Sequence, residues 1–88
     1  MNAELLAIAR ETLAQVAPME AQGWAPAQGI ARQLRWCIAF ASDEPREEHP
    51  GPFSMGLIAT REFDMYGDRP ELADPVNRVQ EAAERALR

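Results

Sequence analysis

The stretch PAQGIARQLRWCIAFA, residues 26–41, decides the fold of this chain of 88 residues. At about 100° per residue its apolar side chains form one helical stripe, made by Ala27, Ile30, Ala31, Leu34, Cys37, Ile38 and Ala41. Trp36 and Phe40 lie beside this stripe, so apolar surface covers more than half of the helix circumference. A helix this apolar must be covered from more than one side. The sequence therefore predicts that residues 26–41 are the central helix of a small all-α bundle.

Two outer segments carry amphipathic patterns that suit helices packed against the central one. Asn2 is a good N-cap for a first helix over residues 3–16. Pro18 is expected to end that helix, because a proline disfavours helical backbone in the residue before it. Near the other end of the chain, Asp74 followed by a proline predicts a last helix over residues 75–87.

The segment over residues 55–66 is also predicted to be a helix, with Ser54 as its N-cap. Its broad inner face is expected to hold Leu57, Ile58, Arg61, Glu62 and Met65. The alternation of apolar residues over positions 53–59 also permits a short strand, for which the chain offers no obvious partner. With this segment as a helix, the sequence predicts a single domain, residues 1–88, with about four helices.

Charge and composition argue against several classes of function. The net charge is −5, and the nine basic residues are all arginine, so the chain lacks the basic surplus that nucleic-acid binding needs. No apolar run approaches the roughly 20 residues of a membrane span. The first residues form no basic leader, so a cytoplasmic location is expected. The sequence holds no recognisable catalytic, metal-binding or nucleotide-binding motif, and we expect no cofactor.

Cys37 and His49 are the single cysteine and the single histidine of the chain. Cys37 belongs to the apolar stripe and has no His or Lys three or four positions away that would lower its pKa, so a buried, unreactive thiol is expected. His49 lies between prolines in a polar segment, and a catalytic or ligand role would need partners that the sequence does not place beside it. These patterns favour a protein without catalytic activity.

Acidic residues gather in two places. The stretch DEPREEHPGP, residues 43–52, is predicted to be a stiff, exposed loop, because its prolines prevent a regular helix or strand. It carries Asp43, Glu44, Glu47 and Glu48, and the second cluster, over residues 62–68, carries Glu62, Asp64 and Asp68 beside Tyr66. Acidic and aromatic side chains on a stiff loop favour recognition of a basic protein surface. An ordinary solvated acidic loop is an equal alternative.

Trp36 projects away from the centre of the core stripe, and an exposed tryptophan is a common interface anchor. We therefore place Trp36 and Tyr66 among the candidate partner-binding residues, although the first or third helix could instead cover Trp36. A different function class follows if Trp36 and Phe40 are both exposed. In that case the chain would be a structural or regulatory subunit that forms a homodimer or larger homo-oligomer.

The block PGPFSMGLIATREFDMYGDRPELA, residues 50–73, resembles a pattern found in small bacterial proteins that are encoded beside secreted toxins as immunity proteins. The resemblance implies an antitoxin that works by stoichiometric binding, without chemistry of its own. Its acidic clusters would cover a basic surface of the toxin or effector. This block and the acidic loop together suggest a binding protein with a basic protein partner.

Overall fold

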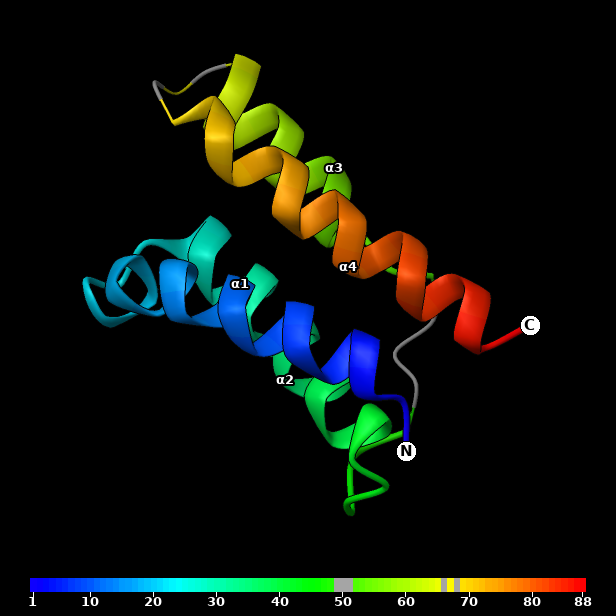
Figure 1. Cartoon of the computed structure of the whole chain (residues 1–88). Helices are drawn as coiled ribbons and strands as arrows, with labels where there is room; N and C mark the ends of the chain where they lie inside the picture. Colours follow the sequence, from blue (N-terminus) through cyan, green and yellow to red (C-terminus); the bar gives the residue numbers. More distant parts are fainter. Residues whose placement is uncertain (49–51, 66, 68) are drawn as a thin grey trace.

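Two helical hairpins stack on each other in the computed structural model, which describes residues 1–48, 52–65, 67 and 69–88 (Figure 1). The elements are α1 (Ala3–Ala21), α2 (Ala25–Ala41), α3 (Met55–Ala59), the π-helical η1 (Thr60–Met65), the 3₁₀ turn η2 (Pro70–Leu72) and α4 (Ala73–Ala86). The described residues contain no strand, which confirms the predicted all-α bundle. Within these ranges no helix is both long enough and apolar enough to cross a membrane.

The first helix begins as predicted and ends later than predicted. Its N-cap is confirmed, because the Asn2 side-chain oxygen accepts a hydrogen bond of 3.0 Å from the Leu5 amide. The predicted end at Pro18 is wrong, since α1 continues through this proline to Ala21. Pro18 and Ala14 both lie on the exposed side of α1. Water can therefore serve the Ala14 carbonyl, which receives no amide proton from Pro18.

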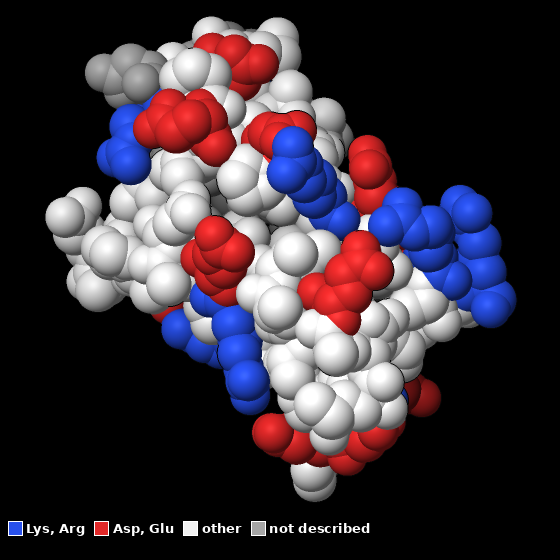
Figure 2. Space-filling view, viewed as in Figure 1, with Lys and Arg blue, Asp and Glu red and all other residues white. Residues whose placement is uncertain are grey.

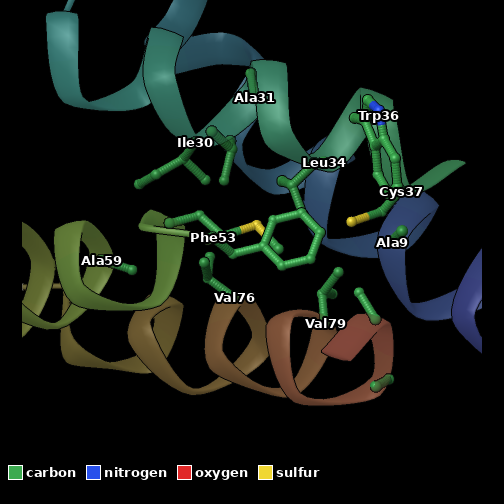
Figure 3. Packing of buried hydrophobic residues seen from close by; sticks show 14 of the residues in the cluster. Ala9, Ile30, Ala31, Leu34, Trp36, Cys37, Phe53, Ala59, Val76 and Val79 are labelled. Carbon is green, nitrogen blue, oxygen red and sulfur yellow. The ribbon is translucent and has the colours of Figure 1, made fainter. Parts of the chain in front are cut away.

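The second helix is the central element, as the sequence predicts. It packs against α1, α3 and α4, and its buried side chains are Ala27, Ile30, Ala31, Leu34, Trp36, Cys37 and Ala41. Figure 3 shows Ile30 and Leu34 directed toward Val76 and Val79 of α4, with Phe53 between the two layers. Almost the whole predicted stripe is thus confirmed as core.

The third segment is a helix and not a strand, but it turns a different face inward from the one predicted. Leu57 and Met65 are 68% and 67% exposed, while Met55, Ala59 and Phe63 are buried. The sequence carries two apolar stripes on this segment, and pattern alone does not rank them. The prediction of Leu57 and Met65 as core residues is therefore wrong.

Gly56 decides which face of α3 turns inward. A Cβ atom at this position would collide with the side-chain oxygen of Asn77 and lie 2.9 Å from that of Gln80. The absence of a side chain lets α3 approach α4 closely enough for Gln80 to accept a hydrogen bond of 2.8 Å from the Gly56 amide. Asn77 donates to the Thr60 hydroxyl at 3.0 Å on the next turn. With Gly56 against α4, the neighbouring Leu57 faces outward.

The N-terminus of α3 is capped from another helix. Ser54 occupies the predicted N-cap position, but its hydroxyl makes no capping bond. Instead, the side-chain oxygen of Gln33 in α2 accepts hydrogen bonds of 3.0 Å and 2.9 Å from the amides of Ser54 and Met55. The Gln33 amide group also donates to the Ser54 hydroxyl at 2.9 Å. The helix start therefore depends on tertiary contact as well as on local sequence.

The last helix begins two residues earlier than predicted. The 3₁₀ turn η2 leads directly into α4 at Ala73, so Asp74 lies in the first turn and not at the N-cap. The Asp74 carboxylate forms an ion pair of 2.8 Å with Arg78, one turn further along the helix. An acidic side chain in the first turn is favourable beside the positive end of the helix dipole.

Candidate partner-binding surface

The loop that follows α2 is the candidate surface, and residues 43–48 are called the acidic loop below. All six of its residues are exposed and lie outside any helix or strand, which confirms the prediction over these positions. Residues 49–51, which include His49, lie outside the described residues. Three contacts that involve side chains attach the acidic loop to α2.

The first contact is an ion pair with two hydrogen bonds. The Arg32 guanidinium donates to the two carboxylate oxygens of Glu47 at 3.2 Å and 2.9 Å. The hydrogen bonds from Arg32 hold the pKa of the Glu47 carboxyl below its usual value of 4.5. The Arg32 side chain is 70% exposed and that of Glu47 is 49% exposed, so water and salt reach the pair easily.

The second contact involves Trp36. Its indole N–H donates a hydrogen bond of 2.9 Å to the Glu47 carbonyl. Trp36 is only 6% exposed, which corrects the expectation of an exposed anchor. Its ring stacks on Phe40 at 5.3 Å between centroids and meets the edge of Phe53 at 5.8 Å. The acidic loop and its aromatic neighbours therefore cover Trp36, and the partner-binding role predicted for this residue stays a prediction.

The third contact is a cation–π interaction. The Arg46 guanidinium lies 5.6 Å from the centroid of the Trp36 ring and 5.1 Å from that of Phe40. Arg46 also donates a hydrogen bond of 3.0 Å to the Glu44 carbonyl within the loop. The two rings are nearly parallel, with 11° between their planes, and the guanidinium lies over both, so the pair is called the Trp36–Phe40 platform below.

The acidic loop starts from a tightly turned residue. Asp43 has a φ of 58°, in the left-handed region that few residues other than glycine adopt. Its carboxylate lies 2.8 Å from the amino group of Met1, and this hydrogen-bonded pair lowers the pKa of Asp43. The next amide, that of Glu44, donates 2.9 Å to the Ala39 carbonyl at the end of α2. The direction in which the chain leaves α2 is thereby fixed.

Shallow hollows lie on both sides of the acidic loop. One, of about 340 Å³, is bordered by Arg32, Arg35, Trp36, Ala39, Pro45, Arg46 and Glu47. Another, of about 420 Å³, is bordered by Trp36, Phe40, Glu44, Pro45, Arg46, Glu47, Glu48 and Leu87. Arg35 in the first hollow is paired with Glu20 of α1 at 2.6 Å, and these hydrogen bonds lower the pKa of Glu20. The loop thus forms a ridge between two open depressions.

The structure separates the two predicted acidic clusters. In Figure 1 the loop after α2 lies at the lower end of the molecule, and η1 lies at the upper end. Asp64 is exposed on η1, while Tyr66 and Asp68 lie outside the described residues. Figure 2 shows acidic and basic side chains interleaved over the visible face. The predicted candidates therefore do not form one continuous acidic patch on that face.

Within the acidic loop the carboxylates fall into two groups. Asp43 and Glu47 are paired inside the chain, whereas Glu44 and Glu48 are exposed at the edge of the second hollow. Sequence reasoning missed the contributions of Arg32 and Arg46. The sequence indicates part of this arrangement. Arg32 precedes Trp36 by one helical turn, which places both side chains on one side of α2.

The described residues contain no group of three or more His, Cys, Asp or Glu side chains placed to hold a metal ion. Cys37 is completely buried in α2, and burial raises the pKa of its thiol to about 12. Its expected burial is confirmed. No family model matches the chain, and neither the curated proteins nor the solved structures give a significant match.

Proposed function

We propose that this chain is a non-catalytic binding protein of the bacterial cytoplasm, an immunity protein that neutralises a basic toxin or effector by stoichiometric binding. The observation that carries the proposal is the acidic loop, an exposed segment that three contacts hold in one conformation on α2. A loop ordered before binding loses little conformational entropy when a partner docks. The resemblance of residues 50–73 to immunity proteins supports the same function.

Electrostatics supports a basic partner. The net charge is −5, and Glu44 and Glu48 lie exposed on the ridge without a salt bridge among the described residues. Charges of this kind raise the rate of association with an oppositely charged surface more than they raise its final affinity. The acidic loop would then steer the encounter, and buried contacts around it would set the lifetime of the complex.

The direct test is neutralisation. A tagged copy is purified from its native host at moderate salt, and proteins that copurify in near-equal amount are identified by mass spectrometry. Each is then expressed alone and together with this chain. The proposal expects one basic protein that is toxic alone and harmless in the presence of this chain. Recovery of the bait alone, or a partner whose toxicity is unchanged by coexpression, contradicts it.

Charge reversal then tests the role of the loop. Glu44→Lys combined with Glu48→Lys is expected to slow association with the recovered partner strongly at low salt and only slightly at high salt. The matched control reverses Glu11 and Glu81, which are exposed on α1 and α4. Equal rates for the two double variants would remove the acidic loop from the interface.

Self-association is the alternative function, and it now rests on different residues. Trp36 is buried, but Leu57 and Met65 are exposed two turns apart on α3 and η1. Exposed apolar side chains of this size can form an interface between two copies. Sedimentation equilibrium at high concentration decides: a mass that rises with concentration and returns to the monomer value in Leu57→Ser supports self-association, and a constant monomer mass removes it.

A further inference from the structure

Two arginines of the chain make contacts that guanidinium groups commonly make with aromatic rings and carboxylates. Arg46 places its guanidinium over the Trp36–Phe40 platform, at 5.6 Å and 5.1 Å from the two ring centroids. Arg32 presents two nitrogens to the two carboxylate oxygens of Glu47. Aromatic rings bind a guanidinium group through cation–π contacts. A carboxylate binds it by accepting two parallel hydrogen bonds.

The two arginines of these contacts are exposed to solvent. Arg46 is exposed, and the Arg32 side chain is 70% exposed. Ion pairs and cation–π contacts at such positions are weak and compete continually with water and salt. The hollows on either side of the loop, of about 340 Å³ and 420 Å³, leave both contacts open to an incoming side chain.

We propose that the Trp36–Phe40 platform and the Glu47 carboxylate form an arginine-binding site, which Arg46 and Arg32 occupy in the free protein and an arginine of the partner occupies by exchange. This inference rests on the proposed function and names the chemistry of the partner. Arg46 lies over the aromatic platform, and Arg32 keeps the Glu47 carboxylate paired, until a partner arrives. They also favour partners that present arginine at the right place over those that are merely basic.

Arginine suits this site better than lysine does. The guanidinium group is planar, so it stacks on the rings and pairs with both oxygens of a carboxylate. The lysine ammonium group is a compact, strongly hydrated charge that does neither as well.

The test measures peptide binding to the full chain at low salt. Hexa-arginine and hexa-lysine carry the same charge and serve as probes, and binding is followed through the Trp36 indole N–H signal in NMR, which Trp24→Phe identifies. Arg46→Ala removes the internal guanidinium from the platform. Arg10→Ala is the matched control, because Arg10 is exposed on α1 and its loss changes the net charge equally.

Arg46→Ala is expected to bind hexa-arginine roughly two to five times more tightly than Arg10→Ala does, because the internal competitor is gone. Hexa-lysine should gain clearly less, because both peptides benefit from the positive charge lost beside the acidic loop, whereas only the guanidinium also stacks well on the rings. Adding Phe40→Leu to Arg46→Ala should abolish the gain, since the platform loses one ring. Equal affinity of the two single variants for hexa-arginine, or an equal gain for hexa-lysine, overturns the inference.

This experiment and the neutralisation assay fail separately. A toxic partner that is neutralised equally well by wild type and by variants of Arg46 and Glu47 would sustain the proposed function and overturn arginine exchange. Peptide exchange at the platform without any neutralised partner would sustain the site and overturn the function.

Discussion

The hydrophobic core and the acidic loop are held in place by different forces. In the core, Leu34, Val76 and Phe63 are at most 2% exposed, so the burial of apolar surface stabilises their packing and salt has little influence. In the acidic loop every residue is exposed, and surface ion pairs and ring contacts hold the chain. Salt weakens such contacts. We therefore expect salt to affect the contacts of the loop more than the packing of the bundle.

The largest expected change in the free energy of unfolding comes from a cavity in the core. Phe63→Ala should lower the free energy of unfolding by about 3–5 kcal/mol, because it removes a buried ring and leaves a void. For a domain of this size that is most of the stability. Leu57→Ala, on the exposed face of α3, should change it by less than about 0.5 kcal/mol. Urea denaturation measures both, and equal losses would mean that the inner face is the one predicted from sequence.

The next effect is expected at alkaline pH. The Cys37 thiol has an ordinary pKa of 9.0 when unfolded, and burial raises it to about 12. A raised thiol pKa gives stability that is complete below pH 9.0 and is lost as the pH rises toward 12. The loss should be about 1.4 kcal/mol per pH unit in that window. Cys37→Ala should lack this component, and denaturation curves at several pH values would show whether the two slopes differ.

A still smaller loss should follow removal of the cap between helices. Gln33→Ala removes the acceptor for the Ser54 and Met55 amides and should cost about 1 kcal/mol. Gln28→Ala is the control, because Gln28 is exposed on the same helix. Hydrogen exchange at the Met55 amide should quicken in Gln33→Ala alone. Unchanged exchange there would show that α3 does not depend on this cap.

The smallest effect on folding is expected in the acidic loop. Glu47→Gln should leave the midpoint of denaturation unchanged, while the Trp36 indole N–H signal shifts because the loop loses its ion pair with α2. High salt should shift the signal of the wild type in the same direction. Because the pKa of the Glu47 carboxyl is lowered, its ion pair with Arg32 is fully formed above pH 4.5 and is lost as the pH falls below that value. Acid should therefore shift the Trp36 signal in the same direction as high salt. If neither salt nor acid shifts the Trp36 signal, the Arg32–Glu47 ion pair does not hold the loop on α2.

The parts of the fold that the sequence predicts are those set by neighbours along the chain. The Asn2 cap depends on an amide three residues away, and the stripe of α2 depends on helical periodicity. The burial of Cys37 follows from its place in that stripe. Local geometry is enough for such features, because their partners lie within one or two turns.

The features that sequence reasoning missed have partners far along the chain. Leu57 faces outward because Gly56 lies against Asn77 and Gln80, more than 20 positions away. The candidate site behaves in the same way: its acids were visible in the sequence, but their pairing with Arg32 and the cover over Trp36 were not. Periodicity gives no distance between remote segments.

By itself, the sequence determined a helical bundle built around α2, an acidic loop without regular structure, and a buried thiol. Tertiary structure alone decided which face of α3 enters the core and which carboxylates stay exposed. It also placed an arginine on an aromatic platform. The physical reason is that helix formation and burial periodicity depend on local spacing, whereas close approach, ion pairing and the covering of a ring depend on how separate segments meet in space.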